Sequence, residues 1–282
     1  MSTPQPDMLA SVHRATTPWR WGGLIAGLLS AGCCVATDTL GRGLILAVPT
    51  LGLGMLIGVL AGELSIRPPT GTTRHAALVI RRVRDYLPTR LTPAVVAATV
   101  TITALLAITT VMGSADDQGR AGRVLLGHSP AKPVPLHGRT LWGLLTPHAT
   151  NTYSPWTGSY YSIPLALVVL AGLLWAYITL HRIVRRPRPG DPITTAETDD
   201  LLRRRAARMV IGACGVLVTL PLLVVSALTA VGLLSIIDHP DSWTVGAWSL
   251  IVLIPVWVGI LLASLLAIVP PRTPSSTARG VS

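Results

Sequence analysis

The chain has 282 residues, of which 50% are hydrophobic and 12% are charged, and its formal net charge at pH 7 is +11. Soluble globular domains carry about 25% charged residues, so this composition excludes an ordinary soluble domain and favours a membrane protein. The basic excess does not indicate a nucleic-acid-binding protein, because it lies in polar segments of about 30 residues that are too short to fold as separate soluble modules.

Six apolar stretches interrupt the polar parts of the chain, and none of them contains Asp, Glu, Lys or Arg. They lie near residues 21–37, 44–62, 93–112, 163–180, 210–236 and 245–269. A helix of about 20 apolar residues crosses a hydrocarbon core about 30 Å thick. The stretches lack the period-two alternation of barrel strands, and a spanning segment must otherwise be helical to satisfy its backbone. The predicted fold class is therefore all-α, a polytopic membrane protein with six transmembrane helices.

Lys and Arg alternate in abundance between the seven segments that flank these stretches. From the first segment to the last they number 2, 1, 6, 4, 8, 0 and 2, so that 18 of the 23 fall in the odd-numbered segments. Cytoplasmic loops of membrane proteins carry an excess of Lys and Arg. The distribution predicts a multi-pass protein of the cell membrane with both termini in the cytoplasm. Residues 1–20 and 270–282 are then irregular cytoplasmic tails, and residues 113–162 form an irregular extracytoplasmic loop.

Two basic cytoplasmic segments are predicted to contain helices at the membrane surface. Residues 73–87 place apolar side chains on one helical face, which is typical of a helix lying on the inner leaflet. Thr194 and Glu197 have the spacing of a capping box, so a helix is expected to begin near Thr195 and continue into the fifth span. Either helix could instead contact a cytoplasmic partner. The arginines expected at the lipid phosphates are Arg81, Arg82, Arg84, Arg185, Arg186, Arg203, Arg204 and Arg205.

Glycines recur four residues apart in the first two spans. They are Gly23 and Gly27 in the first span and Gly54, Gly58 and Gly62 in the second. Glycine at this spacing lets two membrane helices approach closely. The favoured interpretation is packing of the first span on the second, and the alternative is the contact face of a homo-oligomer.

The third span carries a stripe of threonines that includes Thr99, Thr103 and Thr110. Threonine hydroxyls inside a membrane helix usually bond to a carbonyl of the preceding turn, and we expect the same here. The less favoured alternative is a polar stripe that lines the path of a substrate.

The sequence contains no pattern that predicts catalysis, and we expect no catalytic, cofactor-binding or metal-binding residue. No span has a charged residue near its centre, as coupled transporters usually do. The chain also lacks a phosphate-binding Walker loop and the HExxH and GxSxG motifs. In the outer loop, His128, His137 and His148 are spaced too widely for a structural zinc site. Asp116 and Asp117 are the acidic residues of that loop. With the histidines, they are the candidate catalytic groups if the protein is a membrane enzyme.

Six segments of the chain are similar to one set of proteins: Gly62–Ser65, Arg67–Pro69, Val83–Pro88, Gly113–Arg123, Tyr160–Pro164 and Leu201–Arg205. Together they resemble a set of uncharacterised six-span integral membrane proteins of high-GC actinobacteria. The composition is typical of a high-GC genome, because Arg outnumbers Lys 22 to 1 and Phe is absent. The resemblance covers nearly the whole chain and implies membrane placement without any activity.

The favoured function is a non-catalytic membrane component, such as a permease-like or accessory subunit that works with a cytoplasmic ATPase or another membrane subunit. Six spans and two basic cytoplasmic segments would suit the membrane half of an ABC-type exporter, although architecture alone does not establish function. One alternative is a membrane-embedded enzyme that acts on a lipid-linked substrate. Another is a sensor or an immunity protein. The expected partners are the lipid bilayer and the proteins named above, and nucleic acid is not among them.

Overall fold

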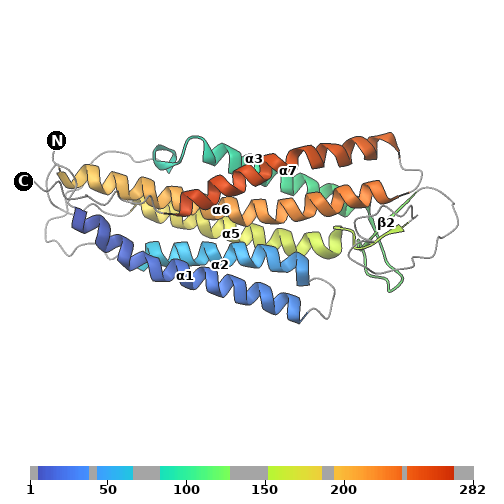
Figure 1. The fold of residues 1–282 in the computed structure, drawn as a ribbon, viewed down its shortest axis with the longest axis horizontal. Coiled ribbons are helices and arrows are strands. Elements are labelled where there is room, and N and C mark those ends of the chain that lie inside the picture. The colour runs from blue at the N-terminus through green and yellow to red at the C-terminus, as the bar shows by residue number, and fades with distance from the viewer. Residues whose placement is uncertain are drawn as a thin grey trace, which may run out of the picture.

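The computed structural model describes residues 6–37, 43–65, 83–127, 152–185, 194–236 and 240–269 as an elongated bundle of parallel and antiparallel helices (Figure 1). Six helices in these ranges are long and apolar enough to cross a membrane. They are α1 (Pro6–Ala36), α2 (Gly43–Ser65), α3 (Leu91–Met112), α5 (Ser159–Arg185), α6 (Thr194–Ser235) and α7 (Asp241–Ile268). The prediction of an all-α membrane protein with six transmembrane helices is therefore confirmed.

Each predicted span lies within one of these helices, to within a residue at its ends. Several helices extend beyond the apolar stretch, because intrahelical hydrogen bonding continues into the polar flanks. The helix expected to begin near Thr195 begins at Thr194, which confirms that prediction. The prediction that residues 1–20 lack regular structure is wrong from Pro6 onward, since α1 begins there and includes Pro18.

Helix α6 forms the centre of the bundle. It contacts α2, α3, α5 and α7, and most of its membrane segment is buried. Three clusters of buried apolar side chains follow its length, around Leu217, Leu222 and Leu233. Helices α1 and α7 lie at the periphery and leave most of their apolar surface exposed. In a membrane, that surface faces lipid.

Helices α1 and α2 pack through the glycines that the sequence analysis identified. Gly23 lies against Gly58, and Gly27 lies against Gly54. A Cβ atom on Gly58 would stand 2.7 Å from the carbonyl oxygen of Trp19, too close for any real side chain. Gly62, which continues the stripe on α2, is buried. The stripe is thus occupied within one chain by the other helix of the hairpin, and it is not free to contact a second copy.

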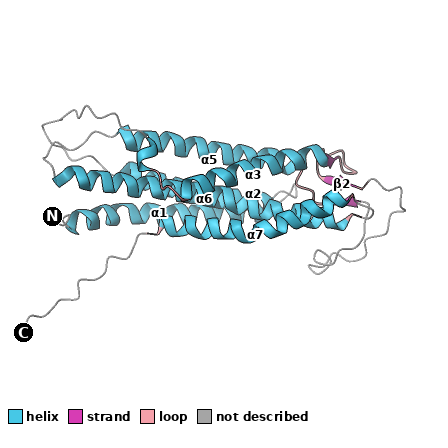
Figure 2. Ribbon diagram, turned by 90° about the horizontal axis from the view of Figure 1, so that it is seen from above, coloured by secondary structure: helices cyan, strands magenta, loops and turns pink. Residues whose placement is uncertain are grey.

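A small antiparallel sheet lies at one end of the bundle, where irregular loop was predicted (Figure 2). Its strands are β1 (Gly113–Ser114), β2 (Val124–Leu126) and β3 (Thr152–Tyr153). Leu125 pairs with Gly113 on one side and with Tyr153 on the other. The beginning of α1 and the end of α7 lie at the opposite end of the bundle (Figure 1). We call the two ends the sheet end and the arginine-rich end.

The predicted surface helix at residues 73–87 is described only from Val83 onward. There the chain forms one turn of 3₁₀ helix, η1 (Val83–Tyr86). Val83, Tyr86 and Leu87 are half-buried and pack against the apolar cluster of α2, α5 and α6. The apolar side chains of residues 83–87 therefore contact the protein rather than the bilayer.

The glycine contact predicts a position-specific effect of adding one methyl group. Gly58→Ala forces α1 and α2 apart, and we expect a loss of about 1–3 kcal/mol in the free energy of unfolding, as for other overpacked interiors. Gly22→Ala is the matched control, because a Cβ atom there meets nothing within 4 Å. Thermal unfolding in detergent measures both variants. Equal stability of the two would contradict the close contact.

Candidate functional site

The arginine-rich end of the bundle holds ten of the twelve arginines in the described ranges. It is built from the beginnings of α1, α3 and α6, the ends of α5 and α7, and η1 (Figure 1). Helix α6 begins 16 residues before the apolar stretch at Val210, which corresponds to about 24 Å of helix beyond the span. This extension of α6, residues 194–209, carries four arginines.

Arg203 joins the extension of α6 to the end of α5. Its Nη1 donates hydrogen bonds to the carbonyl oxygens of Ile183 at 2.9 Å and of Val184 at 2.8 Å. Arg203 is only 3% exposed to solvent. The last carbonyls of a helix have no intrahelical partner, and a cation there also interacts favourably with the helix dipole. Arg203 therefore donates to carbonyl groups at the C-terminus of α5. The prediction that it lies at the lipid phosphates is wrong, because its side chain is buried between the helices.

The other predicted surface arginines behave differently. Arg84, Arg185 and Arg204 are exposed, and Arg205 is half-buried. Arg84 lies 3.8 Å from the carboxylate of Asp85. Arg81, Arg82 and Arg186 lie outside the described residues.

A second contact fastens η1 to the same part of α6. The hydroxyl of Tyr86 donates a hydrogen bond to Oδ1 of Asp200 at 3.3 Å. Asp200 lies three residues before Arg203 and so on the same side of the helix. Residues 200–203 of α6 are thus bonded to both α5 and η1.

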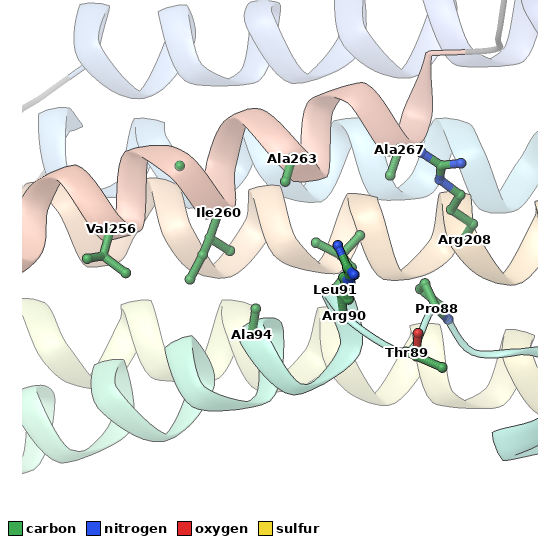
Figure 3. Close-up of a pocket in the computed structure, with 11 residues that line it drawn as sticks. Pro88, Thr89, Arg90, Leu91, Ala94, Arg208, Val256, Ile260, Ala263 and Ala267 are labelled. Atoms are coloured by element: carbon green, nitrogen blue, oxygen red, sulfur yellow. The ribbon is translucent and has the colours of Figure 1, made fainter.

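A groove of about 530 Å³ opens between α3 and α7 at the arginine-rich end. Helix α7 contributes mostly small side chains from its second half, and the segment from Pro88 to Ala94 forms the opposite wall. Figure 3 shows Arg90 and Arg208 toward the end of the groove that lies away from Val256. Both arginines are exposed. The site combines an apolar trough with two cationic side chains at one end.

At the sheet end, Asp116 organises the loop between β1 and β2. Its Oδ1 accepts the backbone N–H groups of Gln118 at 3.0 Å and of Arg120 at 2.9 Å. Its Oδ2 accepts Nε of Arg120 at 2.6 Å and lies 3.6 Å from Nη1 of Arg123. Gly119, between these residues, has a φ of 73°, which favours glycine. Burial raises the pKa of Asp116, but these hydrogen bonds outweigh it and hold the pKa below its ordinary value.

The sheet is seated on the helices by Trp156, which is fully buried. Its Nε1 donates a hydrogen bond to the carbonyl oxygen of Thr109 at 2.8 Å, and its backbone N–H donates one to the carbonyl oxygen of Arg123 at 2.9 Å. The guanidinium of Arg123 lies over the ring of Tyr160, 5.5 Å from its centre. These contacts close the sheet end, and the sequence analysis did not identify Trp156 or Arg123 as structural residues.

The threonine stripe on α3 bonds back to its own helix. Thr99 donates to Val95, Thr103 to Thr99 and Thr110 to Leu106, at 2.8, 2.8 and 2.6 Å. Thr110 also bonds Ser162 on α5 at 2.6 Å. Thr103 is exposed on the outside of the bundle. The hydroxyls of these three threonines are thus engaged with the preceding turn of their own helix, as the favoured interpretation expects.

The described residues hold no group of three His, Cys, Asp or Glu side chains arranged for a metal ion. The three histidines of the outer loop lie outside these ranges. Of the two acids named for an enzymatic alternative, Asp116 accepts hydrogen bonds from Gln118 and Arg120 within its own loop. Asp117 is exposed in the same turn. Comparison with protein-family models, curated protein sequences and solved structures gives no match to this chain.

The junction of α5 and α6 predicts a specific loss of stability. Arg203→Met removes the donor to two buried carbonyls, and we expect a cost of about 1.5–3 kcal/mol, the usual range for hydrogen bonds to a charged group. Arg204→Met at the exposed neighbouring position is the control and should change stability by less than about 0.5 kcal/mol. Thermal unfolding in detergent compares the two, and equal melting temperatures would argue against the Arg203 contact.

The loop around Asp116 predicts a pH dependence. The lowered pKa means that Asp116 stabilises the loop at all pH values above its ordinary value of 3.8, and that the effect disappears as the pH falls through the lowered value. Hydrogen exchange of residues 113–127 should be faster in Asp116→Asn than in the unsubstituted protein at pH 7. The difference should close only below pH 3.8. A difference that closes near pH 6 would show that another group carries the effect.

Proposed function

We propose that this chain is a non-catalytic component of the cell membrane, with both termini in the cytoplasm, which binds a cytoplasmic protein at its arginine-rich end. The observation that carries the proposal is the extension of α6. It continues the central helix about 24 Å beyond the apolar stretch and is fastened by Arg203 and by the contact of Tyr86 with Asp200. A docking surface of this kind costs little conformational entropy to order when a partner binds.

The charges of the two ends support the proposed orientation. At the sheet end, both described arginines interact with Asp116. At the other end, Arg84, Arg185 and Arg204 are exposed. A surplus of exposed arginine is typical of the cytoplasmic side of a membrane protein.

The outward face of the α6 extension indicates the chemistry of the partner. Leu201 is 54% exposed and lies one turn before the exposed Arg204. An exposed leucine followed one turn later by an exposed arginine suits a partner surface that is apolar opposite the leucine and acidic opposite the arginine. A cytoplasmic ATPase subunit is the partner that we propose, and the chain would then act as a permease-like or accessory subunit.

Reporter fusions test the orientation. Green fluorescent protein fused after Ser282 should fluoresce, because it stays in the cytoplasm, and alkaline phosphatase fused there should be inactive. Phosphatase fused after Gly127, beyond the third span, should be active. The opposite pattern would invert the proposed topology.

Purification from native membranes in mild detergent, followed by mass spectrometry, tests the partner. We expect a stoichiometric cytoplasmic subunit with the unsubstituted chain and at least tenfold less of it with Leu201→Glu, since a buried charge at an interface centre costs more than the 1.4 kcal/mol that a factor of ten represents. Arg185→Glu, exposed at the end of α5, is the control for a charge change elsewhere on this end. Purification of a lone protein would refute the proposal.

A further inference from the structure

The groove between α3 and α7 is about as long, measured along the axis of α7, as one membrane leaflet is thick. On α7 its wall runs from Ala267, near the end of the helix, to Val256. These residues are eleven positions apart, or about 16 Å along the helix axis. The hydrocarbon core is about 30 Å thick, so the groove reaches from the membrane surface to about its middle.

The walls of the groove leave room for an acyl chain. Ala263 and Ala267 on α7 and Ala94 on α3 are small and line the space between the two helices (Figure 3). Gly259 on α7 lines the same space and has no side chain. A Cβ atom placed on Gly259 meets nothing within 4 Å. Apolar space of this shape in a bilayer needs an occupant, because an empty gap forfeits the dispersion contacts of its lining.

The mouth of the groove is cationic. Arg90 directly precedes the first residue of α3, and Arg208 reaches the groove from α6 (Figure 3). Both side chains are exposed, and neither has an acidic partner among the described residues. None of the described residues that line the groove is acidic. Two arginines and the hydroxyl of Thr89 are suitable donors to the oxygens of one phosphate group.

We infer that this groove binds one anionic phospholipid from the leaflet at the arginine-rich end. Its phosphate lies between Arg90 and Arg208, and one acyl chain lies along α7 as far as Val256. A soluble phosphate compound would use the mouth but not the apolar trough, whereas a zwitterionic lipid such as phosphatidylcholine would bring its cationic choline group close to two arginines. The inference goes beyond the proposed function and does not depend on whether a protein partner binds α6.

Native mass spectrometry of the full chain, titrated with phosphatidylglycerol or phosphatidylcholine of equal chain length, tests the inference. We expect one phosphatidylglycerol per chain, bound at least tenfold more tightly than phosphatidylcholine. Gly259→Leu places an apolar side chain in the trough, at a position where a Cβ atom meets nothing within 4 Å, and should lower this binding at least tenfold. Gly32→Leu is the matched control, since Gly32 on α1 is equally open, and it should bind as the unsubstituted chain does.

Two further arms separate headgroup from chain. Arg90→Gln combined with Arg208→Gln should lower phosphatidylglycerol binding at least tenfold and abolish its preference over phosphatidylcholine. Glycerol 1-phosphate, which has the headgroup chemistry without the chains, should not displace the lipid at equal concentration. Equal binding by Gly259→Leu and Gly32→Leu, a preference that survives loss of both arginines, or full displacement by glycerol 1-phosphate would each overturn the inference.

Discussion

The structure depends on one constraint, which is that backbone polar groups in a hydrocarbon core must be satisfied within their own segment. Helices meet this requirement everywhere except in their first turns, where N–H groups lack intrahelical partners, and in their last turns, where carbonyls lack them. Arg203 supplies the missing donor at the end of α5, from a helix that begins nine residues after α5 ends. The bond that completes α5 also fastens the beginning of α6. The shape of the arginine-rich end follows from it.

The two ends of the bundle use arginine in different ways. At the sheet end, Arg120 and Arg123 form ion pairs with Asp116, and Arg123 also lies over the ring of Tyr160. These contacts stabilise a short loop. At the other end one arginine is buried as a helix cap, and others remain exposed around a groove and a helix extension. The first arrangement stabilises a fold. The second leaves charge available for lipid and protein, which is why we place the function there.

The amino-acid sequence predicts the six helices because apolar length is a local property. It also predicts where α6 begins, from the spacing of Thr194 and Glu197. The sequence does not predict the burial of Arg203. The number of arginines in a segment cannot show which of them lies beside the end of α5. The groove is hidden for a similar reason, since α3 and α7 are more than 120 residues apart along the chain. Strands of two and three residues leave no alternation to detect, and so β1, β2 and β3 were missed.

The central claim is that α6 continues as a fixed helix beyond the membrane. Hydrogen exchange of residues 194–209, measured by mass spectrometry on the full chain in lipid nanodiscs, tests it most directly. We expect slow exchange through most of this segment, and faster exchange there when Arg203 is replaced by Met. Fast exchange in the unsubstituted protein, at the rate of an unstructured peptide, would show that the extension is not a fixed helix and would contradict the account.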